Sequence, residues 1–171
     1  MAQSPIPTGK LEKAQLISDE SDNIEFMFNP TELDFSHSNT MQEADGARTE
    51  KGLPKVSFSH PNPSKITLKN IYFDTYETGT SVLEHINKFI AALDFATKGT
   101  AKGKRPPIYT FVWGQNQYLR CFIESLDYTL TRFLLDGTPV QAVIGSLDLK
   151  EVDQMDGGDT SYSVNRQSGG R

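Results

Sequence analysis

Residues 65–76 have the sequence KITLKNIYFDTY, and the spacing of their apolar side chains changes midway. Apolar residues occupy even positions up to Leu68 and odd positions from Ile71 onward. Successive side chains of a β-strand point to opposite faces, so this change requires a bulge or bend near Lys69-Asn70. We therefore expect a long strand that curves in the middle.

The same change of parity occurs twice in the C-terminal half. In the strand expected from Tyr118 it falls between Ile123 and Leu126, and in the last strand it falls between Ile144 and Leu147. Three long strands that each change face favour a barrel or a rolled sandwich over a flat sheet.

One helix is expected over residues 82–93. Apolar residues follow one another there at i, i+1, i+4, i+7, i+8 and i+11, which forms a single stripe on a helix. The predicted fold class is therefore mainly β with one helix (α+β), an antiparallel β-barrel or sandwich with long curved strands.

The chain of 171 residues is expected to hold one domain, over residues 11–152. Residues 1–10, with two prolines and a glycine, are expected to be a flexible leader, and residues 153–171, rich in Gly, Ser and Asp, a disordered tail. Residues 36–52 are almost entirely polar and longer than an ordinary connection. We expect an extended arm at about residues 36–58 that orders against a partner.

Composition excludes several classes of protein. The longest apolar run, residues 89–93, has five residues, whereas a membrane span needs about 20. A single cysteine, Cys121, excludes a disulfide within the chain, and a net charge of −5 lacks the basic footprint of a nucleic-acid-binding protein. We expect neither direct membrane insertion nor nucleic-acid binding.

The charges are unevenly distributed along the chain. Residues 12–50 carry ten acidic and two basic residues, whereas residues 51–120 carry ten basic and four acidic residues. Two readings remain open: copies that meet positive patch to negative patch, or ordinary solvated surface.

No catalytic or metal-binding pattern is found. The basic loop at 97–107 departs from a phosphate-binding loop, because Gly99 and Gly103 are one residue too close and Arg105 replaces the required Ser or Thr. Cys121 lies on an apolar parity, and the three histidines show no ligand spacing. We expect no enzyme activity, no cofactor and no metal.

The segment FMFNPTEL at 26–33 follows a short first strand, Leu11–Ser18, and precedes the strand Lys65–Tyr76. Together with the helix over residues 82–93 and the closing segment SLDLKEV at 146–152, this order resembles the tube-protein domain of contractile injection systems, which are phage-tail-like devices. The resemblance covers about residues 10–152. The residues that match the family motif are Phe28, Asn29, Pro30, Glu32 and Leu33.

The resemblance implies a structural subunit that forms a hexameric ring of the inner tube. The expected partners are adjacent tube rings, spike or hub proteins and baseplate proteins, and the expected location is a phage-tail-like particle assembled in the cytoplasm. In similar proteins a LysM module often follows this domain as part of a tube initiator at the baseplate. We expect no LysM module here, since no such segment follows.

Candidate contacts between subunits or rings come from the expected arm and from the basic loop. They are Met41, Arg48, Leu53, Lys102, Lys104 and Arg105. The leading hypothesis is a tube initiator or adaptor between spike and tube. The alternatives are the bulk inner-tube subunit of the same machine and a monomeric β-sandwich binding module.

Overall fold

A computed structural model describes residues 9–48, 50–51 and 54–152. The expected tail (153–171) and most of the expected leader (1–10) lie outside these residues. The elements, in chain order, are β1 (Ala14–Ile17), β2 (Ile24–Glu25), β3 (Glu32–Ser36), β4 (Asn39–Arg48), β5 (Pro54–Pro61), β6 (Lys65–Asp74), α1 (Leu83–Ala91), β7 (Tyr109–Trp113), β8 (Asn116–Phe133) and β9 (Pro139–Glu151).

Seven strands form one antiparallel sheet in the order β2-β1-β7-β8-β9-β6-β3. A separate pair, β4 and β5, forms a two-stranded antiparallel sheet. The predicted class, mainly β with one helix and antiparallel strands, is confirmed. The sheet is not closed into a barrel within this chain, because β2 and β3 are its two end strands.

The bends expected in β6 and β9 lie opposite each other. Asn70 in β6 has a left-handed backbone with φ 54°, and the pairs Lys69–Ser146 and Ile71–Ile144 flank it without a shift of register. Both strands therefore change face at the same level, and the buried side chains on both sides of the bend stay in one core.

The third change of face, in β8, arises from a bulge. Ile123 pairs with Leu149, but the next pair is Ser125 with Asp148, so Glu124 is the extra residue on β8. A bulge of this kind bends a strand and increases its twist. The change of parity that the sequence predicts between Ile123 and Leu126 is explained by this residue.

Helix α1 covers the concave side of the sheet and supplies aromatic contacts to the core. Its Phe89 stacks on Phe26, with ring centroids 5.7 Å apart, and meets Phe73 edge-on at 5.8 Å. Ile86 and Phe89 are fully buried. The helix is shorter than the predicted range of 82–93, although the predicted apolar stripe does face the core.

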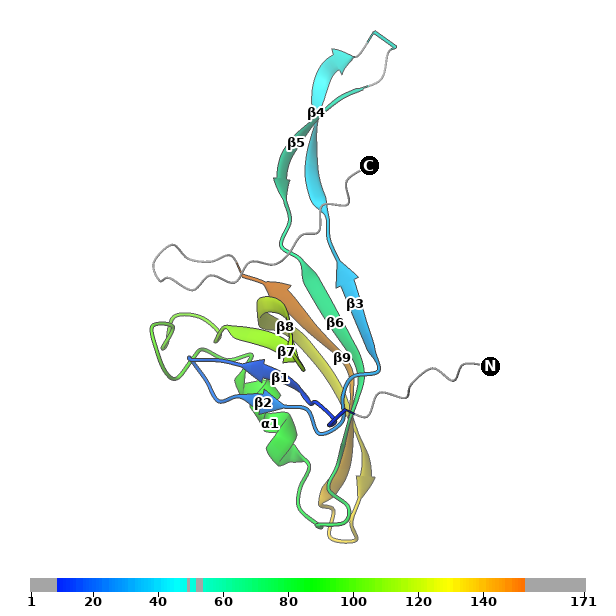
Figure 1. The fold of residues 1–171 in the computed structure, drawn as a ribbon, viewed down its shortest axis with the longest axis vertical. Helices are drawn as coiled ribbons and strands as arrows, with labels where there is room; N and C mark the ends of the chain where they lie inside the picture. Colours follow the sequence, from blue (N-terminus) through cyan, green and yellow to red (C-terminus); the bar gives the residue numbers. More distant parts are fainter. Residues whose placement is uncertain (1–8, 49, 52–53, 153–171) are drawn as a thin grey trace, which may run out of the picture.

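Two hairpins project from the sheet at opposite ends of the molecule (Figure 1). At one end β4 and β5 continue the direction of β3 and β6, and this hairpin lies where the sequence predicts an arm. At its base the N–H of Asn62 donates to the carbonyl of Ser38 at 2.9 Å, and Thr40 Oγ1 donates to Asn62 Oδ1 at 2.7 Å. At the other end, β8 and β9 extend beyond α1.

The bend at Asn70 predicts a specific pattern of stability. Asn70→Val should lower the free energy of unfolding by about 1–2 kcal/mol, because a β-branched side chain is strained at this positive φ. Asn70→Gly should cost little, since glycine adopts this conformation freely. Urea unfolding followed by circular dichroism measures both changes. Tyr72→Val, on the same strand but outside the left-handed region, is the control, and an equal loss in all three variants would contradict the prediction.

Candidate functional site

The family motif holds the N-terminal segment against the sheet. The side-chain amide of Asn29 is bonded twice: Oδ1 accepts the N–H of Ala14 at 2.9 Å, and Nδ2 donates to the carbonyl of Glu12 at 2.8 Å. The adjacent Pro30 is buried. An amide is required here because one side chain must both accept and donate a hydrogen bond.

We call the two hydrogen bonds of the Asn29 amide the Asn29 clamp. The other motif residues lie near it in the sequence. Phe28 is half exposed, and the ammonium of Lys13 lies 5.7 Å from its ring centroid. Leu33 on β3 packs against the core, and Glu32 lies 3.4 Å from the ammonium of Lys69. The five motif residues therefore divide between two contacts: Asn29 binds the segment around β1, whereas Glu32 and Leu33 lie on opposite faces of β3 where it pairs with β6.

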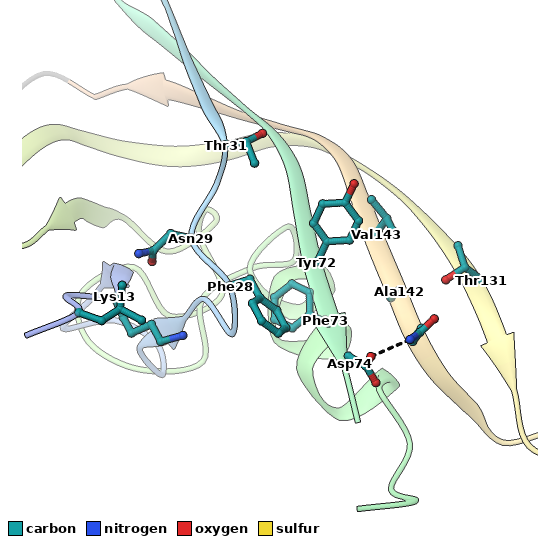
Figure 2. Close-up of a pocket in the computed structure, with 12 residues that line it drawn as sticks. Lys13, Phe28, Asn29, Thr31, Tyr72, Phe73, Asp74, Thr131, Ala142 and Val143 are labelled. Carbon is teal, nitrogen blue, oxygen red and sulfur yellow. Dashed lines mark hydrogen bonds between the residues drawn. The ribbon is translucent and has the colours of Figure 1, made fainter. Parts of the chain in front are cut away.

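An open, largely apolar pocket of about 730 Å³ lies next to the motif (Figure 2). Its walls come from the N-terminal segment at Leu11 and Lys13, from residues 28, 29 and 31, and from the strands β6, β9 and β8. Polar side chains contribute to the walls, although most of the exposed surface is apolar. One of them, the carboxylate of Asp74, accepts a hydrogen bond from Gln141 Nε2 at 2.6 Å.

In the described part of the chain, the end strands β2 and β3 have unpaired outer edges, and two further stretches, on β6 and on β8, lack a partner strand on one side. β3 pairs with β6 only over Lys65–Lys69, so residues 70–73 of β6 have no partner strand on that side, and the N–H of Asp74 there donates to Met27 Sδ at 3.1 Å. On the other side of the sheet, β7 pairs with β8 only as far as Cys121, and residues 122–133 of β8 pair with β9 alone. Unpaired N–H and C=O groups on such edges can accept another strand.

The convex face of β6, β9 and β8 carries ordered pairs of polar side chains. Glu124 lies between two lysines, with Lys65 at 2.5 Å and Lys150 at 3.2 Å. The hydrogen bond from Lys65 lowers the pKa of Glu124, so the carboxylate is ionised at neutral pH. This side of the sheet is a hydrated, charged surface and not a second core.

A second polar cluster on the same face is centred on Asp148. Its two carboxylate oxygens accept hydrogen bonds from Thr67 at 2.6 Å and from Ser125 at 2.5 Å. The hydroxyls of Ser125 and Thr67 lower the pKa of this carboxyl group, in that order of importance. The cluster links β6, β9 and β8 side by side.

The basic loop is tied to the acidic turn between β1 and β2. Arg105 makes two hydrogen bonds of 2.8 Å to Glu20, whose carboxylate also accepts the N–H of Ile108 at 2.9 Å. The hydrogen bonds from Arg105 lower the pKa of Glu20. Lys98 pairs with Asp22 at 2.6 Å on the exposed surface. Part of the opposite charge in residues 12–50 and 97–105 is therefore matched within one chain.

The remaining predicted contact residues are not brought together. Lys102 and Lys104 are exposed in the loop after α1, whereas Met41 is half exposed on β4 in the arm. Arg48 ends β4 and its backbone pairs with Pro54. Leu53 lies outside the described residues.

The chemistry of the described groups gives no reactive centre. Burial raises the pKa of the Cys121 thiol to about 12, so a thiolate is disfavoured at neutral pH. Among residues 9–48, 50–51 and 54–152, no three His, Cys, Asp or Glu side chains cluster as a metal site would require. Over the same residues, no helix has the length and apolar character needed to cross a membrane.

Sequence reasoning missed three exposed apolar side chains near the open edges. Tyr72 of β6 lines the pocket and is half exposed, while Phe133 and Leu135 are exposed at the end of the β8–β9 hairpin. A signal for the last two is present in the sequence, because three consecutive apolar residues, 133–135, directly precede the turn residues Asp136-Gly137.

Residues of this chain match a known protein family. A family model described as "Contractile injection system tube protein" matches residues 10–156. A search of curated proteins finds none that matches significantly.

The Asn29 clamp predicts a loss of stability when its amide is removed. Asn29→Ala should lower the free energy of unfolding by about 1–3 kcal/mol, because it leaves the N–H of buried Ala14 without its acceptor. Asn29→Asp keeps the acceptor but loses the donor, so its loss should be smaller. Asn87→Ala, on the exposed side of α1, is the matched control for chemical denaturation, and a loss in the control equal to that of Asn29→Ala would argue against the clamp.

The Glu20–Arg105 pair predicts a pH-dependent stability. Because the pKa of Glu20 is lowered in the folded chain, its contribution is full at neutral pH and is lost as the pH falls through that lowered pKa. Glu20→Gln should cost about 1.5–3 kcal/mol at pH 7. The difference in the free energy of unfolding between the variant and the wild type should become smaller below about pH 4. Thermal unfolding from pH 3 to pH 7 measures this difference; a difference independent of pH, or one equally large in the exposed-site control Asp22→Asn, would count against the pair.

Proposed function

The chain belongs to the contractile injection system tube protein family, and on this basis we propose that it forms a hexameric ring of the inner tube at the junction with the baseplate. The single observation that carries the proposal of a ring is the pair of unpaired strand edges on opposite sides of the sheet, on β8 and on β3–β6. In this role it is a structural subunit without catalytic activity.

Ring closure would complete both edges at once. The observed order makes β8 antiparallel to β9, β9 to β6 and β6 to β3, so β8 and β3 run in opposite directions. When neighbouring copies have the same orientation, β8 of one copy can therefore pair with β3 of the next in the antiparallel sense of the whole sheet. A contact between two different surfaces of identical subunits generates a ring when the rotation closes.

The two faces of the sheet suggest how the ring is oriented. Helix α1 covers one face, while the other carries the ion pairs and hydrogen bonds around Glu124 and Asp148. We infer that the face without the helix lines the channel, because a hydrated channel requires polar side chains and leaves no room for a helical layer.

The arm is suited to contacts along the tube. It projects beyond the sheet in the direction of β3 and β6, and it exposes Met41 on β4 (Figure 1). Lys102 and Lys104 belong to the basic region of the chain, residues 51–120, and both are exposed. We propose both as contacts with acidic residues of an adjacent subunit or ring. Arg105 contributes less to such a contact, because Glu20 already compensates its charge.

The assignment to the tube initiator, between the spike and the repeating tube, rests on the resemblance in sequence. The partners would be spike or hub and baseplate proteins on one side and tube rings on the other, in a particle assembled in the cytoplasm. The bulk inner-tube subunit is the second candidate. Copy number separates them, because an initiator forms one ring per particle whereas a bulk subunit recurs along the tube.

Deleting the arm tests its role along the tube. Replacing residues 39–61 by Asn-Gly joins Ser38 to Asn62, whose backbones are already hydrogen-bonded, and so forms a short hairpin on β3 and β6. We expect a folded chain that forms rings but no stacked tube, visible by electron microscopy of particles made with the variant. Lys102→Glu with Lys104→Glu should weaken stacking without affecting folding. Normal tubes in both variants would overturn the proposed roles of the arm and of the two lysines in stacking. Separately, many copies of this chain per particle would exclude the tube initiator.

A further inference from the structure

We propose that the end of the β8–β9 hairpin of one copy fills the pocket beside the Phe28-Asn29-Pro30 motif of the next copy in the ring. This inference rests on the proposed function, and it names the two surfaces that meet. The inserted side chains are Phe133 and Leu135, and the receiving surface is formed by Leu11, Phe28 and Tyr72.

The hairpin end is an ordered turn that holds apolar side chains in water. The N–H of Leu134 donates to the carbonyl of Thr138 at 2.9 Å, and the N–H of Gly137 donates to the carbonyl of Leu134 at 2.9 Å. Leu135 is fully exposed at 111% and Phe133 is 54% exposed. Neither belongs to the core, so the fold itself gives no reason for apolar residues at this turn.

The pocket offers the complementary surface. Three large apolar side chains that line it are also partly exposed: Leu11 at 70%, Phe28 at 50% and Tyr72 at 49%. Figure 2 shows Phe28 on one side of β6 and Tyr72 standing on the strand itself. The pocket volume of about 730 Å³ is large enough for more than one side chain, and burying such side chains is favourable by about 1.5–3 kcal/mol each.

The hairpin cannot turn back into its own pocket, so the insertion that we propose joins two copies. Thr131 lines the pocket near the start of the hairpin, but the ladder continues through the pair Phe133–Pro139 and carries the turn away from it. The open edge of β8 runs to Phe133, and the pocket borders residues 72 and 73 of β6, which have no partner strand on the side of β3. Both surfaces are thus continuous with the edges that ring closure would bring together.

The charges at the two surfaces are also complementary. Lys13 lies at the pocket beside Phe28, and Asp136 lies in the turn next to Leu135. The other ionised group of the pocket, Asp74, already accepts a hydrogen bond from Gln141 within the chain. Gln141 is neutral, so Asp74 keeps its negative charge, and the cation that acts on it is Arg132 of the same chain. Lys13 is therefore the cation of the pocket that Asp136 of the inserted turn would approach.

Site-specific cross-linking in the assembled particle tests the contact. A photo-reactive phenylalanine analogue is placed at residue 135, and cross-linked peptides are identified by mass spectrometry. We expect links between copies to the peptides that contain Leu11, Phe28 or Tyr72. Links to another segment of this chain, or to a different baseplate or tube protein, would overturn the inference while the ring itself remained. Absence of this chain from any ring in wild-type particles would overturn the proposed function instead.

Substitutions give an independent measure of the same contact. Leu135→Asp should reduce the amount of ring at least tenfold with unchanged thermal unfolding, because the side chain makes no contact within its own core. Phe95→Asp, at a residue that is 62% exposed and lies outside the pocket and the hairpin, is the matched control and should assemble normally.

A charge exchange tests the polar part of the contact. Lys13→Glu alone should reduce ring formation, and adding Asp136→Lys should raise it again, since the pair is exchanged between copies. Asp136→Lys alone is the reference, because Asp136 Oδ1 also accepts the N–H of Thr138 at 2.9 Å within its own turn. Failure of the double variant to recover, together with normal rings in Leu135→Asp, would refute the insertion.

Discussion

The fold depends on the strict alternation of side chains along a β-strand. A strand that bends without correction would turn its apolar residues from the core to the solvent. At Asn70 and Gly145 two neighbouring strands make the correction together, so their pairing stays in register while both keep their apolar residues inside. The curvature of the sheet around α1 follows from this shared bend and from the bulge at Glu124.

Curvature in turn determines which edges remain open. The bend at Asn70 directs the later residues of β6 away from β3, so β3 pairs with β6 only as far as Lys69. The hairpin of β8 and β9 continues beyond β7, which leaves the last part of β8 with one partner strand. An isolated chain with such edges is prone to non-specific association, and the proposed closure into a ring would pair them. The geometry of one subunit is thus consistent with assembly as its main activity.

The charge pattern illustrates how a tertiary contact changes an interpretation from sequence. Acidic and basic regions that are separate along the chain left two interpretations open, attraction between copies and ordinary solvated surface. Glu20 and Arg105 lie 85 residues apart in sequence but form a bidentate ion pair within one molecule. This pair holds the basic loop against the turn after β1. Lys102 and Lys104 remain exposed on the same loop, so their charge stays available to an external partner.

The amino-acid sequence by itself determined the strands that change face, the amphipathic helix, the projecting polar segment and the family motif, because these depend on local periodicity and residue type. It did not reveal why the motif needs Asn29, since the atoms that this amide binds, on Glu12 and Ala14, lie 17 and 15 residues away. Only the tertiary structure decided which edges stay unpaired and that Leu11, Phe28 and Tyr72 share a pocket. These features depend on the order of strands in the sheet, and hydrogen bonding between distant segments sets that order.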